Sequence, residues 1–400
     1  MFSSRTIESL CLQVTSGGTP SRGVERYWSN GTVRWFKTGE LRDGWLEESE
    51  EKITEEALAN SSAKIFPPHT VLMAMYGDGK TITSLGVLRN PSATNQACCA
   101  MIVDPQECEY RFLFYKLKQV RSALLKLVVA GAQRNLSSGI IKNFRVEVPS
   151  IRTQTAIADI LSSYDDLIEN NRRRIALLEE AARMLYREWF VHFRFPGHEH
   201  VKMSEGLPDG WRKTKIQELF TTVLGGTPAR SNPNFWSGDV PWINSGEINK
   251  IRIVEASEFI TEEGLLKSAA KLMRPGTTVL AITGATLGQV SYLEIECSAN
   301  QSVVGVYDEE QRLNEFAYLF FKENAKKLVL LGSGGAQQHI NKEIVNTFLF
   351  IKPHESLIRN FKDAVAPMFA QIRTLLFQNI KLSEARDLLL PRLMNGEIAI

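Results

Sequence analysis

The sequence predicts a mixed α/β (α+β) protein in which two tandem domains are separated by two long helices, and these helices form an antiparallel coiled coil with pseudo-twofold symmetry. Three observations support this fold class. An internal repeat covers most of the 400 residues. Short β-like runs punctuated by glycine fill most of each repeat. A sustained heptad-type apolar pattern then closes each repeat.

The internal repeat is visible as matching segments in the same order with a nearly constant offset. The four letters "GGTP" occur at 17–20 and again at 225–228. The other matches are "YWSNGTVRWFKTGEL" (27–41) with "FWSGDVPWINSGEI" (235–248), "ITEEAL" (53–58) with "ITEEGL" (260–265), "TVLMAM" (70–75) with "TVLAIT" (278–283), "TNQACCA" (94–100) with "ANQSVVG" (299–305), and "GAQRNL" (131–136) with "GAQQHI" (335–340). These matches indicate a tandem duplication.

Each copy has a β-rich part followed by a helical part. The β-rich part carries one clear helical stretch near its end, "FLFYKLKQVRSALLKL" in the first copy. We therefore expect a first domain over 1–150 and a helical spacer over 151–190, then a linker over 191–206. The second domain is expected over 207–354 and the second helical spacer over 355–400.

The helical parts step four, three, four, three through apolar positions, which is typical of a coiled-coil seam. In the first copy these positions are Ile157, Leu161, Tyr164, Ile168, Asn171, Ile175, Leu178, Ala182, Leu185 and Trp189. In the second copy they are Phe361, Val365, Met368, Ile372, Leu375, Asn379, Leu382, Arg386, Leu389 and Leu393.

Two signals predict a break early in each spacer. Pro367 suits a first helical turn, and Ser163, which aligns with it, forms a possible capping box with Asp166. We therefore expect a short helix, a break near 163 and 367, and then an arm of roughly 27 residues, about 40 Å long. Pro391 is expected to end or kink the second arm.

The arms should run antiparallel, because the second domain follows the first arm after a short linker and the second arm must then return. An antiparallel register places Ile157 opposite Leu393, Asn171 opposite Asn379, and Tyr164 opposite Arg386. Two facing amides can satisfy each other inside a seam, and a polar pair of this kind fixes register.

Composition excludes some classes of protein. A formal net charge of +2 gives no sign of a surface that is basic throughout, although a local basic groove stays possible. Without a signal peptide or an apolar run of membrane-spanning length, the sequence indicates a cytoplasmic protein with five free thiols. The histidines at 192, 198 and 200 lack a fourth metal ligand nearby, so a polar linker is the preferred interpretation.

Two motifs resemble catalytic signatures, but the local pattern argues against both. "AMYGDGKT" (74–81) has Ala74 where a phosphate-binding loop needs glycine, and a strand-like run follows Lys80. "NPNF" (232–235) is the tetrapeptide of adenine methyltransferases, but the first copy has "VERY" there and no glycine-rich cofactor loop follows a strand. With no nucleophile–base set either, the chain is expected not to be an enzyme on its own.

Each copy also contains a set of glycine-rich loops. The glycines and flanking residues match between the copies, while the polar residues at the loop tips differ. "FKTGE" (36–40) becomes "INSGE" (243–247), and "GAQRN" (131–135) becomes "GAQQH" (335–339). Arg, Lys, Asn and Gln side chains reach base edges, and glycine lets backbone amides approach phosphates. The pattern favours a reader of two different DNA half-sites.

The chain resembles the specificity subunit of type I restriction–modification enzymes. The motifs that carry the resemblance are "SGGTPSR" and "LGGTPAR", each followed by an aromatic–Trp pair and "TGEL" or "SGEI", together with "REWFVHFRFPG" (187–197), "LPDGW" (207–211) and "LLLPRLMNGEI" (388–398). They span nearly the whole chain. The first copy lacks the "LPDGW" lead-in, so its first strand is expected to be less well anchored.

The resemblance implies two target-recognition domains, each contacting DNA through its loops. The implied DNA contacts in the first copy are Thr19, Arg22, Lys37, Thr38, Lys80, Gln133, Arg134 and Asn135. In the second copy they are Thr227, Arg230, Asn244, Ser245, Thr286, Gln337, Gln338 and His339. Arg22, Arg230 and Lys80 are expected to contact phosphate, and the amide side chains to read bases. The aromatic pairs at 28, 35, 236 and 242 are assigned to packing beneath the loops.

The resemblance also implies partners and cofactors. The helices would dock two methyltransferase subunits, and motor–nuclease subunits would complete the complex. S-adenosylmethionine, ATP and Mg would be bound by those partners, and none by this chain. Three alternatives stay open at this point: a modification-only methyltransferase complex, a coiled-coil scaffold whose ends bind protein, and a nucleotide hydrolase that uses Lys80.

Overall fold

The computed structural model describes residues 2–77, 81–128, 135–332, 339–398 and 400. It divides into two compact units, Met1–Glu169 with Ile380–Ile400 and Asn170–Asn379. Both boundaries fall inside the long helices α5 (Ile151–Tyr186) and α9 (Glu355–Met394). Each unit therefore contains one β-rich domain and a part of both helices, and each is described here by itself.

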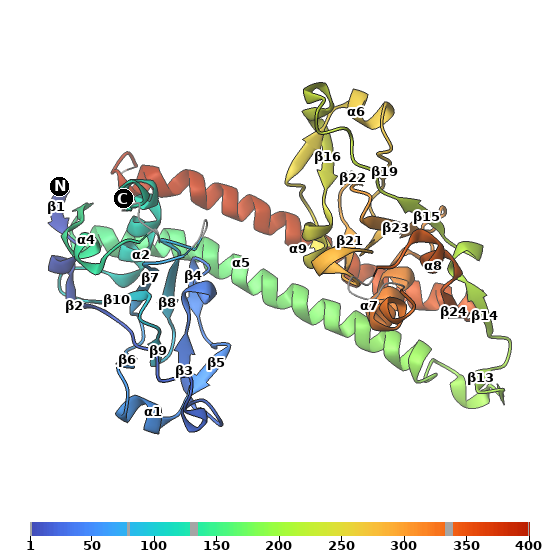
Figure 1. Ribbon diagram of the computed structural model, residues 1–400, viewed down its shortest axis with the longest axis horizontal. Coiled ribbons are helices and arrows are strands. Elements are labelled where there is room, and N and C mark those ends of the chain that lie inside the picture. Colours follow the sequence, from blue (N-terminus) through green and yellow to red (C-terminus); the bar gives the residue numbers. More distant parts are fainter. Residues whose placement is uncertain (1, 78–80, 129–134, 333–338, 399) are drawn as a thin grey trace. The chain divides into compact units, whose positions relative to one another are not determined.

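The first unit contains three sheets (Figure 1). The five-stranded sheet has the order β2-β10-β7-β8-β4, the four-stranded sheet the order β5-β3-β9-β6, and β1 pairs with β11. The strand bounds are β1 Ser3–Thr6, β2 Cys11–Ser16, β3 Val33–Phe36, β4 Gly44–Leu46, β5 Glu51–Ile53, β6 Ile65–Phe66, β7 Val71–Ala74, β8 Leu85–Leu88, β9 Ser92–Thr94, β10 Cys98–Val103 and β11 Arg145–Val148.

The second unit repeats this topology with the orders β15-β23-β20-β21-β17, β18-β16-β22-β19 and β14-β24, and it adds the hairpin β12-β13. Its strands are β12 Met203–Ser204, β13 Leu207–Pro208, β14 Arg212–Lys215, β15 Thr221–Leu224, β16 Trp236–Ile243, β17 Arg252–Ile253, β18 Glu258–Ile260, β19 Leu272–Met273, β20 Thr278–Ala281, β21 Val290–Leu293, β22 Cys297–Ala299, β23 Val303–Tyr307 and β24 Leu349–Lys352. The mixed α/β fold class with two domains is confirmed.

Strand register corrects two details of the sequence comparison. Ala74 pairs with Cys98 in the first unit, and Ala281 pairs with Val303 in the second, so the alignment of 70–75 with 278–283 is shifted by one residue. The first strand is also anchored as firmly as its counterpart, because β1 pairs with β11 over four residues just as β14 pairs with β24.

Short helices cover the sheets at equivalent places in both units. They are α1 Glu55–Ala59, α2 Tyr110–Gln119, α3 Arg121–Lys126 and α4 Ser138–Asn143, and then α6 Glu262–Leu266, α7 Asn314–Leu330 and α8 Lys342–Thr347. The repeated "ITEE" segment is a helix start, because Thr54 Oγ1 accepts from Ala57 N at 3.2 Å and Thr261 Oγ1 accepts from Gly264 N at 3.0 Å.

The predicted break in each long helix is wrong. α5 runs through Ser163 and α9 through Pro367 without interruption, over 36 and 40 residues, or about 54 and 60 Å. Pro367 is exposed, so water can satisfy the carbonyl that its ring leaves without a donor. Ser163 Oγ donates back to Ile160 O at 2.7 Å and does not act as a cap. Pro391 likewise lies inside α9, which ends at Met394.

Within each unit the helix segments pair antiparallel. In the first unit Ile157 and Leu161 share a buried cluster with Leu390 and Leu393. In the second unit Ile175 packs with Ile372 and Leu375. Nearer the end of α5, the rings of Trp189 and Phe361 lie 5.6 Å apart.

One of the two polar pairs predicted between the helices is in contact. Asn171 Nδ2 donates to Asn379 Oδ1 at 2.9 Å, within the second unit. In the first unit Arg386 forms its ion pair across the helices with Asp165, the neighbour of Tyr164, and a second ion pair with Asp387. The sequence argument therefore missed the acidic partner of Arg386.

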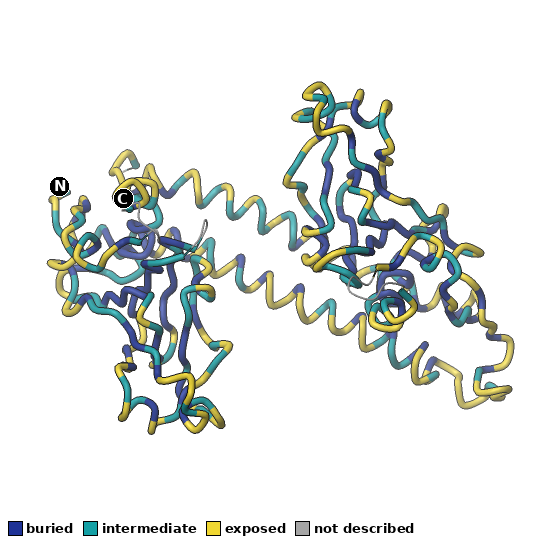
Figure 2. Tube along the Cα trace, in the orientation of Figure 1, coloured by how far each residue is buried: buried dark blue, intermediate teal, exposed yellow. Residues whose placement is uncertain are grey.

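Buried side chains form separate clusters in the two units. Figure 2 shows the central strands of both five-stranded sheets as mostly buried, while buried and exposed residues alternate along the long helices. Trp35 and Trp242 are among the largest fully buried side chains, one in each four-stranded sheet. Among the described residues, no helix is long and apolar enough to cross a membrane.

Candidate nucleic-acid interface

The repeated "GGTP" segment is a turn that lies tightly against two other backbone segments. Gly18 N donates to Thr94 O at 2.9 Å, and a Cβ on Gly17 would lie 2.2 Å from that same oxygen. A Cβ on Gly18 would lie 2.3 Å from Ser62 O. Because backbone atoms surround both positions, neither glycine can accept a side chain without a shift of the chain.

The second domain builds the turn in the same way. Gly226 N donates to Ala299 O at 2.8 Å. A Cβ on Gly225 would lie 2.2 Å from Asn300 O, and one on Gly226 would lie 2.2 Å from Ala269 O. The repetition of "GGTP" thus reflects a steric requirement that both domains share.

A pair of tryptophans supports each turn from beneath. Trp35 Nε1 donates to Gly18 O at 2.9 Å, and Trp242 Nε1 donates to Gly226 O at 3.1 Å. The partner rings, Trp28 and Trp236, stand edge-to-face on them at 5.1 and 5.2 Å. These contacts confirm the assignment of the four tryptophans to packing.

An arginine covers each tryptophan pair and is held by a carboxylate. The guanidinium of Arg22 lies 3.7 Å from the ring centre of Trp28 and forms an ion pair with Glu51 at 2.7 Å. Arg230 lies 3.6 Å from the ring centre of Trp236 and forms an ion pair with Glu258. Both arginines stay about half exposed, so each keeps a face toward solvent.

The next loop begins where β3 or β16 ends, and hydrogen bonds to a glutamate hold it; this glutamate is half-buried in the first domain and buried in the second. Glu40 Oε1 accepts from Lys37 N at 2.8 Å, and its Oε2 accepts from Glu50 N at 2.9 Å. Glu247 accepts from Asn244 N at 3.3 Å and from Ser257 N at 3.2 Å. The glutamate is present in both repeated segments, but no role was predicted for it from the sequence.

Backbone hydrogen bonds bring further loops to the same edge of each domain. In the first domain Met75 N donates to Ala97 O at 2.8 Å and Leu136 N donates to Met75 O at 2.9 Å. In the second, Ile282 N donates to Ser302 O at 2.9 Å and Ile340 N donates to Ile282 O at 3.0 Å. We call this set of loops the loop edge: residues 17–20, 37–38, 95–97, 75–77 and 135 in the first domain, and 225–228, 244–245, 300–302, 282–286 and 339 in the second.

The loop edge brings together most of the described candidates. Thr19 and Thr227 lie in the glycine turns, while Lys37, Thr38, Asn244 and Ser245 begin the next loop. Asn135 forms a bridge with Tyr76, and His339 is exposed at the equivalent place. Thr286 ends a short turn after β20. Lys80, Gln133, Arg134, Gln337 and Gln338 lie outside the described residues.

Two further glutamines at the loop edge were not among the candidates. Thr19 Oγ1 donates to Gln96 Oε1, and Thr227 Oγ1 donates to Gln301 Oε1. Both glutamines are exposed. The shared "NQ" in "TNQ" and "ANQ" was the available signal.

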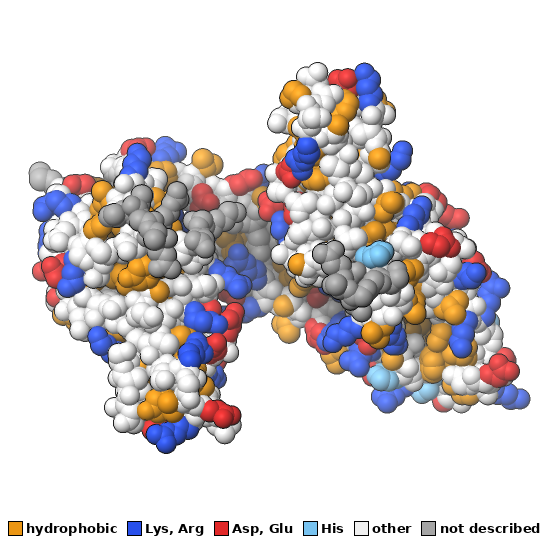
Figure 3. Space-filling view, in the orientation of Figure 1, with side chains coloured by type: hydrophobic (Ala, Val, Ile, Leu, Met, Phe, Trp, Pro, Cys, Tyr) orange, Lys and Arg blue, Asp and Glu red, His pale blue; other side chains and the backbone are white. Residues whose placement is uncertain are grey.

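Charge differs between the two loop edges. In the first domain Lys37 Nζ contacts both Glu50 at 3.1 Å and Glu51 at 3.4 Å. The hydrogen bond with Glu50 raises the pKa of Lys37, and the hydrogen bond with Arg22 lowers the pKa of Glu51. Figure 3 shows basic and acidic side chains intermingled along the β5 side of this domain. The position of Lys37 is taken by the neutral Asn244 in the second domain.

The described residues carry neither a metal-binding cluster nor a reactive thiol. No group of three or more His, Cys, Asp or Glu side chains there could hold a metal ion. The thiols are poor nucleophiles, because burial raises the pKa of Cys98, Cys99, Cys108 and Cys297 and raises that of Cys11 to about 12.

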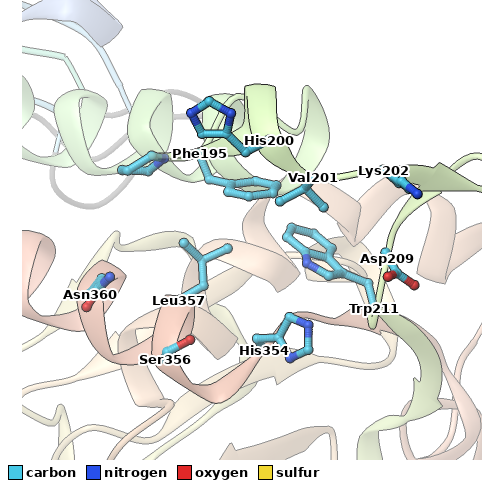
Figure 4. Close-up of a pocket in the computed structure, with 11 residues that line it drawn as sticks. Phe195, His200, Val201, Lys202, Asp209, Trp211, His354, Ser356, Leu357 and Asn360 are labelled. Atoms are coloured by element: carbon cyan, nitrogen blue, oxygen red, sulfur yellow. The ribbon is translucent and has the colours of Figure 1, made fainter.

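A pocket of about 560 Å³ lies in the second unit, between the 195–211 segment and the start of α9. Figure 4 shows the side chains of Phe195, Val201, Trp211 and Leu357 converging on it. Its lining includes His200, His354 and Asp209, but these side chains do not form one of the groups of three that could hold a metal ion, and the described residues contain no such group. It is separate from the residues of the loop edge.

These features define a class of protein: a duplicated recognition scaffold that presents two equivalently built loop edges with different side chains. A family model described as "Type I restriction modification DNA specificity domain" matches residues 2–180 and 208–355. The chain therefore belongs to the family of type I restriction–modification DNA specificity domains, and it carries the domain twice.

Known relatives extend over nearly the whole chain. The chain is 26% identical to the type I restriction enzyme MjaIX specificity subunit of Methanocaldococcus jannaschii, over 97% of this chain and 91% of that protein. It is 25% identical to the HindI specificity subunit of Haemophilus influenzae, over 64% and 70%. These relatives are named for specificity, which agrees with the expectation that this chain is not itself the catalytic subunit.

One solved structure supports the fold. The crystal structure of the type-I restriction-modification system S subunit from M. genitalium superposes with a TM-score of 0.61 at 17% sequence identity, over 98% of this chain and 96% of that chain. The two chains therefore share their fold.

Proposed function

We propose that this chain recognises DNA for a type I restriction–modification complex and that each domain reads one half of a bipartite, asymmetric site. The observation that carries the proposal is the loop edge, which has the same backbone hydrogen bonds in both domains but different side chains at its tips. A shared frame with different tips suits two readers that dock on DNA alike and prefer different bases.

The individual residues have distinct proposed roles. Lys37 and Thr38 would help to read the first half-site, and Asn244 and Ser245 the second. The exposed faces of Arg22 and Arg230 would contact phosphate, although each guanidinium also holds its tryptophan pair. Asn135 and His339 would add one further difference between the halves.

The helices would have a second role in assembly. We propose that α5 and α9 set the spacing between the half-sites and dock two methyltransferase subunits, with motor–nuclease subunits completing the complex. The exposed apolar side chains Leu177 and Leu388, both 71% exposed on the helices, would suit such contacts. S-adenosylmethionine, ATP and Mg would be bound by the partner subunits.

The test is a genome-wide map of methylated adenines in cells that carry the cognate methyltransferase gene with or without this gene. We expect a split, asymmetric motif that appears only when this chain is present. Absence of chain-dependent methylation, despite a demonstrated complex with the methyltransferase, would contradict the proposal.

Matched variants then test whether the two domains act separately. Replacing Lys37 and Thr38 with Ala should change the methylated motif in one half, and replacing Asn244 and Ser245 with Ala should change it in the other. If either pair alters both halves equally, the assignment of one half-site to each domain is wrong.

A further inference from the structure

The Thr–Gln pairs are polar groups of the loop edge that are the same in both domains, and both glutamines are exposed. Thr19 and Gln96 in the first domain correspond to Thr227 and Gln301 in the second, with the same donor and acceptor atoms. The hydrogen bonds that place them are also the same, since Gly18 N and Gly226 N donate to the residue two positions before each glutamine. The pair is therefore a common element of both readers.

A contact that is identical in both domains cannot distinguish two different half-sites. The neighbouring tips do differ: Lys37 corresponds to Asn244, and Asn135 to His339. What two unlike half-sites have in common is the sugar–phosphate backbone, whose contacts position a protein on DNA and carry no direct sequence information.

The orientation of the amide fits such a contact. Each threonine hydroxyl donates to Oε1 of its glutamine, which occupies one of the two lone pairs of that oxygen, fixes the orientation of the amide and leaves Nε2 to donate. Among the described residues, no acceptor is assigned to Nε2 of Gln96 or Gln301. Bidentate reading of adenine would use Oε1 and Nε2 together, whereas a single N–H donor suits a phosphate oxygen.

We propose that Gln96 and Gln301 each donate from Nε2 to a backbone phosphate of DNA, and that Thr19 and Thr227 are the positioning residues that orient them. This inference rests on the proposed function, because it needs both domains to bind DNA. It adds two sequence-independent contacts, one in each half of the complex, that set how each domain docks before its variable tips meet the bases.

The experiment uses the full chain in complex with its methyltransferase subunits and measures affinity by fluorescence anisotropy. Three duplexes are compared: the motif from methylation mapping, the motif with one half scrambled, and unrelated DNA. Gln96→Ala and Gln301→Ala should each weaken binding to all three duplexes about tenfold, as expected for a lost hydrogen bond to a charged group. Gln13→Ala, at an exposed glutamine within β2, is the matched control and should change nothing.

Two further readouts separate a positioned phosphate contact from a structural role. Because glutamine is neutral, Gln96→Ala should leave the dependence of affinity on salt unchanged, whereas Arg22→Ala, which removes a cation proposed to contact phosphate, should make it shallower. Thr19→Val should reproduce part of the Gln96→Ala loss, and Thr19→Ser, which keeps the hydroxyl, should restore affinity.

Specific outcomes would overturn the inference. Relaxed base preference in one half with unchanged affinity for unrelated DNA would mean that the glutamine reads a base. Unchanged affinity with a lower unfolding temperature would mean that the pair only stabilises the turn. A wild-type complex that binds DNA with no preference for the mapped motif would instead contradict the proposed function, and the glutamine variants would still report on the phosphate contact.

Discussion

The two domains share their loop edge but pack against the helices with different chemistry. In the second domain Arg252, whose side chain is 1% exposed, forms ion pairs with Glu179 of α5 and with Glu294 at 2.8 Å. Its guanidinium also lies against Phe369 of α9 at 4.2 Å and against Tyr292 at 4.6 Å. A buried cation thus joins the domain to the parts of both helices that belong to this unit.

The first domain has Trp45 at the position of Arg252. Trp45 pairs with Val87 on the neighbouring strand as Arg252 pairs with Tyr292. Its ring stacks on Phe114 at 5.7 Å, and Arg89 lies over it at 4.9 Å. The corresponding ion pair to the helix, between Arg89 and Asp166, is at 4.0 Å and largely exposed.

The comparison shows which features of a duplicated fold must be kept. The loop edge is retained because backbone atoms surround its glycines and leave no alternative side chain. The same position can be filled by an aromatic ring that stacks on Phe114 or by a buried cation that two carboxylates neutralise. The predictions below test how far this difference extends.

The largest expected effect is on the buried cation. Arg252→Met should lower the free energy of unfolding of the second unit by about 3–5 kcal/mol, because Glu179 would lose this ion pair and the buried Glu294 would keep only the longer one with Arg373, at 3.6 Å. Chemical denaturation followed by hydrogen exchange in each unit measures this loss. The first unit should be unaffected.

The same variant should respond to pH. Burial already raises the pKa of Glu294, and removal of Arg252 removes an interaction that lowers it. A carboxyl whose folded-state pKa lies above its unfolded value favours folding at low pH and loses this contribution as pH rises. The defect should therefore be smaller at pH 5 than at pH 8. Adding Glu179→Gln and Glu294→Gln should recover part of the stability, and a defect independent of both would count against a charge-based explanation.

The second prediction concerns what the domains share. Gly18→Ala and Gly226→Ala should each destabilise their own domain by about 1–3 kcal/mol, because the added Cβ meets backbone atoms in both. Gly39→Ala is the control, since a Cβ there has no heavy atom within 4 Å. Unequal losses of stability at the two turns would contradict the structural equivalence of the two domains. A loss of the same size for Gly39→Ala would contradict the steric explanation.

The third prediction concerns the helix pair. Asn171→Leu should cost about 1–2 kcal/mol, because it removes the donor to Asn379 Oδ1 inside the seam. The double variant with Asn379→Leu should cost less than the two single changes added together. A double-mutant cycle measured by denaturation provides the test, and additive costs would show that the amides do not act as a pair.

The smallest expected effect is on non-specific DNA binding. Glu50→Gln with Glu51→Gln removes the carboxylates that hold Lys37 and Arg22, so affinity for unrelated DNA should rise about threefold and become more dependent on salt. Glu258→Gln, which releases only Arg230, should give a smaller rise. Equal rises would show that releasing Lys37 adds nothing to the effect of releasing the arginine.

The repeat explains how much the sequence could predict. The order of the repeated motifs predicted the fold class. The heptad pattern predicted that Asn171 faces Asn379, because the register of a helix pair follows from the spacing of its apolar residues. The break at Pro367 was wrong, since packing of the buried face of α9 outweighs a single exposed proline. The contact between Thr19 and Gln96 was missed because the two residues are distant in sequence. The buried position of Arg252 could not be read from a β-strand of two residues.

The ion pair between Arg252 and Glu179 also limits how this chain can evolve by recombination. Glu179 lies on α5, ahead of the linker, whereas Arg252 lies inside the second domain. A gene exchange that replaced only the residues after the linker would keep Glu179 and replace Arg252, the cation that pairs with it. In the opposite direction, an incoming domain that contains Arg252 would not bring Glu179 with it. New second domains should therefore be acquired most readily when the crossover lies ahead of Glu179, so that both charges are inherited together.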